Sequence, residues 1–198
     1  VEHFYPELIS NLSTCKSPQQ MLGALIKTYY AEKENIDPKD IVSVSIMPCT
    51  AKKFESARDE MNASGYQDVD YVLTTREFAR MCKAAGIDWD NLPEEEFDTP
   101  LGISTGAGVI FGTTGGVMEA ALRTAYELVT KEELDSLEFT AVRGLEGVKE
   151  AEIEMNSVKL KVAVVHSLKN AKIVMDKVKE GTADYAFIEV MACPGGCI

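Results

Sequence analysis

Two apolar runs in this chain end in the same short pattern, which is a methionine, one further residue and a cysteine. The run over residues 41–47 leads into Met47-Pro48-Cys49, and the run over 185–190 leads into Met191-Ala192-Cys193. Both runs are rich in valine and isoleucine, which is typical of strands, and Pro48 cannot continue a hydrogen-bonded ladder. We therefore expect each cysteine to lie just past the carboxyl end of a strand.

The rest of the chain alternates between helix and strand signals. Pro18 opens a helical run, Thr74 and Glu77 form a capping box, and Asn156-Ser157 predicts a hairpin turn. Helices are expected over residues 17–30, 74–85, 116–129 and 171–179, and strands over 41–47, 70–73, 138–143, 147–155, 159–165 and 185–190. This alternation predicts an α/β fold, with a mostly parallel sheet flanked by helices and one β-hairpin. Ligands of such sheets bind beyond the carboxyl ends of the strands, so we expect the two cysteine motifs to be neighbours on one edge of one sheet.

Composition narrows the classes of function. A length of 198 residues predicts one domain, and a net charge of −12 argues against a surface that neutralises nucleic-acid phosphates. No apolar run approaches the roughly 18 residues that a membrane span requires. Five cysteines are an odd number in a chain large enough to build a core without disulfides. They favour metal or cluster binding in a reducing compartment.

Three of these cysteines are candidate ligands. Cys193 and Cys197 are separated by Pro-Gly-Gly, and Cys49 shares the Met-x-Cys pattern. Zinc and an iron–sulfur cluster both remain open, because each needs a fourth ligand beyond these three thiols. Two adjacent glycines favour a cluster, since they let backbone pass close to a bulky inorganic core. Cys82 is expected to be a packed core residue and Cys15 a partly buried thiol.

Four further residues flank these motifs. Lys52 and Glu55 follow Cys49 at helical spacing, but such a pair contributes only about 0.2–0.5 kcal/mol to a helix. An amine placed beside a thiolate-bound anionic centre explains the spacing better, because a buried negative charge needs a partner. Met47 and Met191 offer soft, polarizable walls for a metal cluster, with ordinary core packing at the strand ends as the alternative.

These motifs resemble the second and third signature motifs of the iron-iron (FeFe) hydrogenases. The resemblance covers essentially the whole chain. It extends over Lys16-Ser17-Pro18-Gln19-Gln20, Lys27-Thr28-Tyr29-Tyr30, Gly106-Ala107-Gly108-Val109-Ile110-Phe111-Gly112, Gly115-Gly116-Val117-Met118-Glu119-Ala120-Ala121 and Val142-Arg143-Gly144. One Cys-x3-Cys pair would be weak evidence, whereas this ordered set is specific.

The resemblance implies an H-cluster, which is a 4Fe-4S cubane bridged by a cysteine to a two-iron site carrying carbon monoxide, cyanide and azadithiolate. It implies that Cys49 and Cys193 ligate the cubane and that Cys197 bridges to the two-iron site. Lys52 would donate a hydrogen bond to a cyanide, with Glu55 orienting it. The remaining implied site residues are Met47, Met191, Pro18, Gln19 and Phe111, which match positions lining the pocket, and Ser13, which matches a serine of the proton path.

The chain departs from the family pattern at both ends. The first motif, Thr-Ser-Cys-Cys-Pro, and two glutamates of the proton path would precede Val1, and a glycine-rich run would follow Ile198. We therefore expect residues 1–198 to be a single partial H-cluster domain that is inactive in isolation. Any signal peptide would also lie upstream, so a cytoplasmic location is expected and a periplasmic one stays open.

The resemblance implies that the parent protein oxidises dihydrogen reversibly to protons and electrons. Its expected partners are a ferredoxin or other electron carrier, protons and dihydrogen, and the remainder of the parent chain. The alternative is a hydrogen-sensing or iron–sulfur assembly relative that binds a cluster without turnover, although the presence of Ser13, Lys52 and Met191 counts against it. A third hypothesis is a metal-free α/β scaffold.

Overall fold

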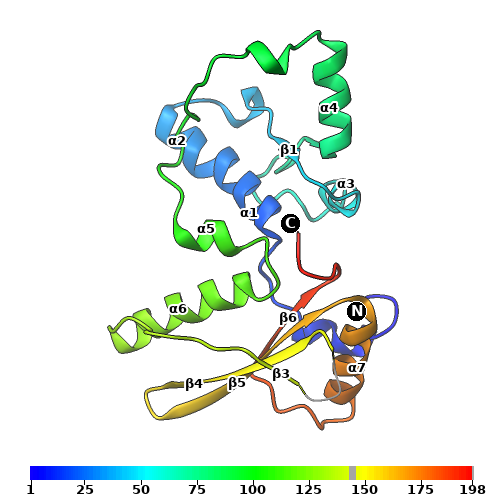
Figure 1. Cartoon of the computed structure of the whole chain (residues 1–198), viewed down its shortest axis with the longest axis vertical. Coiled ribbons are helices and arrows are strands. Elements are labelled where there is room, and N and C mark those ends of the chain that lie inside the picture. Colours follow the sequence, from blue (N-terminus) through cyan, green and yellow to red (C-terminus); the bar gives the residue numbers. More distant parts are fainter. Residues whose placement is uncertain (143–145, 198) are drawn as a thin grey trace. The chain divides into compact units, whose positions relative to one another are not determined.

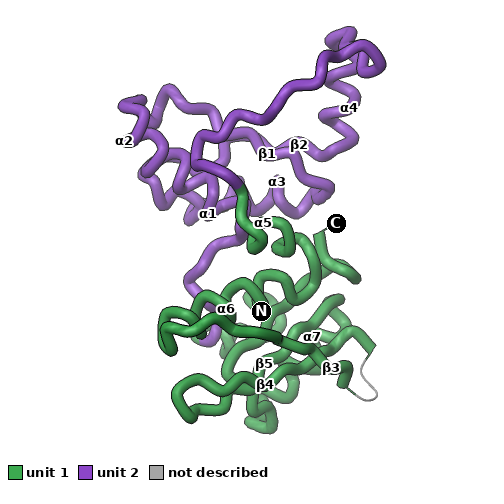
Figure 2. Tube along the Cα trace, turned by 60° about the vertical axis from the view of Figure 1, so that its left-hand side comes forward, with its two compact units in different colours: residues 1–10, 104–198 green, residues 11–103 purple. Residues whose placement is uncertain are grey.

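The computed structural model describes residues 1–142 and 146–197 of the chain (Figure 1). They form two compact units: unit 1 comprises Val1–Ser10 and Ser104–Ile198, and unit 2 comprises Asn11–Ile103 (Figure 2). The chain thus passes between the units twice. Among the described residues, none of the helices is both long and apolar enough to span a bilayer.

Unit 2 begins with a continuous helical segment. It consists of α1 (Pro18–Leu25), the π-helix η2 (Ile26–Tyr30) and α2 (Ala31–Glu34). The Ser17 side chain accepts the Gln20 N–H as N-cap, and Asn35 ends the segment in the left-handed conformation with φ 56°. The predicted helix over 17–30 is confirmed and runs one turn further. The short 3-10 helices η3 (Pro38–Asp40) and η4 (Trp89–Asn91) lie in the connecting loops.

The sheet of unit 2 is a parallel pair of short strands, β1 (Val44–Ile46) and β2 (Tyr71–Leu73). Helix α3 (Ala51–Ser56) follows β1, and α4 (Thr75–Ala84) follows β2. The predicted capping box is confirmed, because Thr74 Oγ1 accepts the Glu77 N–H while the Glu77 carboxylate accepts the Thr74 N–H. Cys82 is buried on α4, as expected.

Unit 1 is built on a four-stranded sheet in the order β3 (Thr140–Ala141), β4 (Val148–Met155), β5 (Val158–His166) and β6 (Phe187–Met191). The predicted hairpin is confirmed: Asn156 and Ser157 have φ values of 49° and 65°, which the two-residue turn between β4 and β5 requires. Helix α7 (Leu168–Lys179) supplies the crossover that makes β5 and β6 parallel.

The α/β class is therefore confirmed, and the arrangement of the strands differs from expectation. The described strands form two sheets, and the larger is mixed because β3–β4 and β4–β5 pair antiparallel. Since β1 and β6 belong to different sheets, the two cysteine motifs are not neighbours on one edge of one sheet. The strand predicted over 138–143 shortens to Thr140–Ala141. Its last residue, Arg143, and Gly144 of the resembling Val142-Arg143-Gly144 run lie outside the described residues.

The core of unit 1 occupies both faces of its sheet. Helix α6 (Gly116–Thr130) packs on one face, where Met118 and Leu122 meet Ala151, Ile153, Val162 and Val164. Helix α7 packs on the other, where Ala171 and Val174 meet Val148 and Val165. The short helix α5 (Gly106–Ile110) precedes α6. The N-terminal segment, with the 3-10 helix η1 (Pro6–Asn11), is fastened to α7 by bonds from Tyr5 to Asp176 and from Lys179 to Glu7.

In unit 2, a buried ion pair joins the helical segment to the sheet. Lys27 is 3% exposed, and its Nζ lies 2.7 Å from Asp70 Oδ2. The same carboxylate accepts the Ser43 N–H at 2.7 Å, while the Asp70 N–H donates to the Ser43 carbonyl. A buried ammonium is stable only when it is paired, so this contact fixes η2 against the start of both strands.

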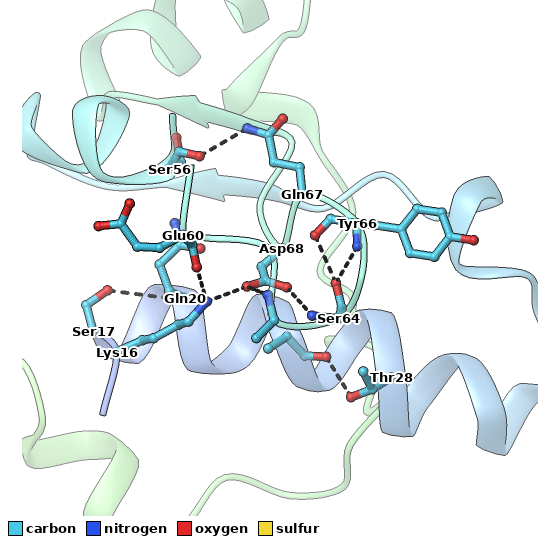
Figure 3. A network of polar contacts seen from close by, with 12 residues as sticks. Lys16, Ser17, Gln20, Thr28, Ser56, Glu60, Ser64, Tyr66, Gln67 and Asp68 are labelled. Carbon is cyan, nitrogen blue, oxygen red and sulfur yellow. Dashed lines mark hydrogen bonds and ion pairs between the residues drawn. The ribbon is translucent and has the colours of Figure 1, made fainter. Parts of the chain in front are cut away.

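A second charged contact fixes the start of α1 (Figure 3). The fully buried Asp68 carboxylate accepts bonds of 3.0 Å from Lys16 Nζ and from the N–H groups of Ala63 and Ser64. Burial alone would raise the pKa of Asp68, but the bonds from Ser64, Lys16 and Ala63 outweigh it and lower the pKa below 3.8. The ionised form is therefore the one that the fold stabilises.

Replacing Asp70 by alanine should lower the free energy of unfolding of unit 2 by about 3–5 kcal/mol, because it leaves the Lys27 ammonium buried without a partner. Glu34→Ala is the matched control: its pair with Lys33 is exposed, so the change should stay within about 0.5 kcal/mol. Urea unfolding followed by the fluorescence of Trp89, the only tryptophan in the chain, reports both. Equal losses of stability in the two variants would contradict the conclusion that the buried Lys27–Asp70 pair stabilises unit 2.

The Asp68 contacts predict a loss of stability in acid. A carboxyl whose pKa is lowered by folding stabilises the native state fully above its unfolded pKa, and this contribution is lost as pH falls from about 4 through the folded pKa. Asp68→Asn should therefore lower stability at pH 7 and flatten the stability curve below pH 5. Lys16→Met should move the acid transition to higher pH. An unchanged acid transition in both variants, measured by circular dichroism, would rule this out.

Candidate functional site

The predicted site residues divide between the two units. Unit 2 carries Ser13, Pro18, Gln19, Met47, Cys49, Lys52 and Glu55, and unit 1 carries Phe111, Met191, Cys193 and Cys197. We call these groups the Cys49 half-site and the Cys193–Cys197 half-site.

The Cys49 half-site lies past the carboxyl end of β1, as predicted. The Met47 N–H donates to the Leu73 carbonyl at 2.9 Å, so pairing with β2 continues one residue beyond the strand before Pro48 ends it. Cys49 is partly buried in the turn between β1 and α3. On the first turns of α3, Lys52 Nζ lies 2.8 Å from Glu55 Oε2, and both side chains are about one-fifth exposed at 18% and 21%.

Gln19 is held in this half-site by a residue that sequence reasoning missed. Ser45 Oγ donates to Gln19 Oε1 at 2.7 Å, and Gln19 Nε2 donates to the Lys52 carbonyl at 3.4 Å. Ser45 thereby ties β1 to α1, and Gln19 ties α1 to α3. No signal in the sequence points to this role: alternation along β1 predicts apolar side chains inside, whereas Val44 and Ile46 are exposed and the strand turns Ser45 inward.

The remaining unit 2 residues lie on the segment leading into α1. Pro18 is exposed in the first turn of that helix, and Ser13 is exposed upstream of it. The Ser13 hydroxyl oxygen accepts the Cys15 N–H at 3.1 Å. Cys15 is exposed, which corrects the expectation of a partly buried thiol, because the segment preceding α1 lies outside the core.

The Cys193–Cys197 half-site is a glycine-containing loop after β6. Met191 is the last residue of that strand and is half-buried, while Cys193 and Cys197 are both exposed. Gly195 and Gly196 have φ values of 82° and 108°, which other residues rarely adopt. The loop thus presents two accessible thiols on backbone that only glycine permits.

This loop is bonded to the segment between α5 and α6. The Thr114 N–H donates to the Gly195 carbonyl at 3.2 Å, and the Cys197 N–H donates to the Gly112 carbonyl at 2.5 Å. Thr113 and Gly196 form an isolated antiparallel bridge. Phe111 is half-buried and directly precedes Gly112, whose carbonyl accepts the Cys197 N–H. The predicted pocket residue Phe111 is therefore next in sequence to a residue that contacts Cys197.

The donor set of the two half-sites is soft. Within either unit, counting described residues only, no three His, Cys, Asp or Glu side chains are grouped to hold one metal ion. Neither half-site is thus a complete site for a single metal ion. Thiolates are the donors that iron–sulfur clusters take, and three of the usual four are present. The position that a Cβ on Gly195 would take has nothing within 4 Å, and both thiols of the loop are exposed, so these residues fit a cluster in their chemistry.

A model of one protein family, described as iron only hydrogenase large subunit, C-terminal domain, matches residues 1–198. The chain belongs to this family. It is 57% identical to the periplasmic Fe hydrogenase large subunit of Nitratidesulfovibrio vulgaris, over 100% of this chain and 47% of that protein. The resemblance drawn from the motifs is confirmed.

The chain is also similar to a solved hydrogenase structure and to a protein of iron–sulfur cluster assembly. A solved structure of a variant of FeFe-hydrogenase HydA1 from Chlamydomonas reinhardtii matches with a TM-score of 0.80 at 44% identity, over 98% of this chain and 56% of that one. The cytosolic Fe-S cluster assembly factor narfl of Xenopus tropicalis is 30% identical, over 96% of this chain and 41% of that protein. The chain spans between about a third and just over half of the length of the relatives it matches.

The loop geometry predicts that two adjacent glycines differ sharply in tolerance. A Cβ on Gly196 would lie 2.2 Å from the Gly112 carbonyl oxygen, whereas one on Gly195 would meet nothing within 4 Å. Gly195→Ala should therefore carry only the left-handed backbone cost of about 1–2 kcal/mol. Gly196→Ala should cost more and break the bridge to Thr113. Thermal unfolding and the alkylation rates of Cys193 and Cys197 measure the difference, and equal behaviour of both variants would refute it.

Proposed function

We propose that the protein containing this chain is an FeFe hydrogenase, which oxidises dihydrogen reversibly to protons and electrons at an H-cluster. The observation that carries the proposal is the placement of the thiols. Cys49, Cys193 and Cys197 all lie past strand ends, outside the core, and they come in the order of the family's second and third motifs. The two other cysteines lie elsewhere, Cys82 in the core and Cys15 on the segment before α1.

Three thiolates hold the cluster in this proposal. Cys49 and Cys193 would hold the 4Fe-4S cubane, and Cys197 would be the ligand shared with the two-iron site. The two-iron site, with its carbon monoxide, cyanide and azadithiolate ligands, supplies the redox chemistry of dihydrogen when it is bound. The exposed positions of Cys193 and Cys197 support this assignment, since a ligand thiol must be reachable by the cluster.

Lys52 binds a cyanide in this proposal. An ammonium has three donors, and the 2.8 Å bond to Glu55 uses one of them. The pair is about four-fifths buried, so Glu55 holds the Lys52 ammonium in place and leaves its other donors for an anionic ligand. Burial of the pair matters here, because an exposed ion pair at the same helical spacing would contribute little to stability and would not hold the Lys52 ammonium in place.

The remaining assignments are the pocket walls and the proton path. Met47, Met191, Pro18, Gln19 and Phe111 line the two-iron site. The Gln19 amide supports this, because Ser45 and the Lys52 carbonyl fix it before any ligand binds. Ser13 relays protons: its oxygen already accepts the Cys15 N–H, which leaves its O–H to donate onward.

The electron carrier and the location are part of the same proposal. Electrons leave through a ferredoxin or another carrier, with the help of the rest of the parent chain. A cytoplasmic location stays a prediction, and the 57% identity to a periplasmic hydrogenase keeps the periplasmic location open.

A second candidate function is iron–sulfur assembly without turnover, and the 30% identity to an Fe-S cluster assembly factor favours it. The presence of Ser13, Lys52 and Met191 favours the hydrogenase, because a cluster that only serves assembly needs neither a proton path nor a pocket for dihydrogen. Turnover separates the two candidates.

The full-length protein, matured with the two-iron cofactor, should evolve hydrogen from a reduced carrier. Cys49→Ser should lower bound iron and acid-labile sulfide, and Cys197→Ser should abolish hydrogen evolution by removing the bridging sulfur. Cys15→Ser is the matched control, because this exposed thiol has no role in the proposal and its N–H bond to Ser13 survives. A fully loaded protein that evolves no hydrogen would leave the assembly function, and stoichiometric iron in Cys49→Ser would refute the ligand assignment.

A further inference from the structure

The Glu189 carboxylate binds the start of helix α6 from the neighbouring strand. Glu189 is the third residue of β6, four positions before Cys193. One of its oxygens accepts the Gly115 N–H and the other accepts the Met118 N–H, each at 2.7 Å. The backbone of Glu189 pairs with Val164 in the sheet, but its side chain takes no part in that pairing, so its two bonds serve to join β6 to α6.

The start of α6 depends on this outside partner. The first N–H groups of a helix have no acceptor within it, and the N-cap residue usually supplies one from its side chain. Here the N-cap is Gly115, with φ 90° and no side chain. Glu189 takes over the cap, and its negative charge also suits the positive end of a 15-residue helix.

The segment that precedes α6 also forms hydrogen bonds to the loop that carries Cys193 and Cys197. Thr114 and Gly112 bond to Gly195 and Cys197, while Gly115 bonds to Glu189. Residues 112–118 therefore hold the chain both before Cys193 and up to Cys197. One segment thus contacts the chain on both sides of Cys193, at Glu189 before it and at Gly195 and Cys197 after it.

The segment that contains Gly115 and Gly116 is closely packed against its neighbours. A Cβ on Gly116 would lie 1.7 Å from the Ile110 carbonyl oxygen, and one on Gly115 would lie 3.4 Å from Val164 Cγ1 on β5. The segment is pressed against α5 on one side and against the sheet on the other. A shift of the Glu189 contact must therefore move the loop, since the segment cannot relax into open space.

We propose that Glu189 is a positioning residue for the cluster: by capping α6 from β6, it sets the separation and direction of the Cys193 and Cys197 thiols. The proposal rests on the proposed function, since it takes these thiols as cluster ligands. Glu189 itself would touch neither iron nor substrate. It acts in the way of residues that orient metal ligands, whose loss typically weakens metal affinity about 10- to 100-fold.

The test uses the full-length protein carrying the cubane but prepared without the two-iron cofactor. Glu189→Gln keeps the shape but replaces one acceptor oxygen with an amide that opposes a backbone N–H, and Glu189→Ala removes both acceptors. Retention of iron against a chelator should weaken about 10- to 100-fold in both, and the EPR spectrum of the reduced cubane should change. Glu189→Asp, which keeps the carboxylate on a shorter stem, should recover part of the loss.

Two controls separate positioning from general destabilisation. Glu152→Gln makes the same charge change on the exposed surface of β4 and should leave retention and spectrum unchanged. Val174→Ala opens a cavity under α7, on the opposite face of the sheet, and should lower the unfolding temperature without altering the EPR spectrum.

The outcomes distinguish the two proposals. Wild-type protein that binds no iron would sink the proposed function. Wild-type protein that binds iron, with Glu189→Ala indistinguishable from it in chelator resistance and spectrum, would overturn the role of Glu189 alone. An EPR change as large in Val174→Ala as in Glu189→Gln would also overturn it, because the change in the spectrum would then result from a loss of stability of the protein and not from a shift of the thiols.

Discussion

The contact between two glycine-containing backbone segments, residues 112–116 and 193–197, is the constraint on which the unit 1 half of the site depends. Hydrogen bonds of 2.5 and 3.2 Å join them, and a Cβ at Gly196 would overlap the Gly112 carbonyl. Such an approach excludes a side chain at position 196. The thiols of Cys193 and Cys197 are exposed on a loop whose Gly195 carbonyl and Cys197 N–H are already hydrogen-bonded.

Elements with strong local signals could be predicted from sequence. The capping box at Thr74, the turn at Asn156-Ser157 and the proline at the start of α1 each depend on chemistry within a few residues, and each is found as expected. Strand pairing could not be predicted in this way. Runs of valine and isoleucine indicate a strand but not its neighbour, so the division into two sheets and the antiparallel pairs appear only in the fold.

The candidate site shows the same division between local and distant information. Cysteine spacing located the thiols and placed both motifs at strand ends, because strand and loop signals adjoin them. Ser45 and Glu189 escaped sequence reasoning, since a serine or glutamate in a strand has many ordinary roles. Their partners are 26 residues away for Ser45, and 74 and 71 residues away for Glu189. Residues that position a site are thus harder to predict than residues that form it.

A cluster that takes ligands from both units would link their stabilities. Each unit has its own anchoring contacts, Lys27–Asp70 in unit 2 and the two packed faces of the sheet in unit 1, and the chain passes between the units twice. A ligand that binds only the native state of both units stabilises each of them, by a free energy that grows with the logarithm of its affinity. Under the proposed function, loss of one thiol therefore weakens more than the half-site that carried it, because the other unit loses the same bound partner.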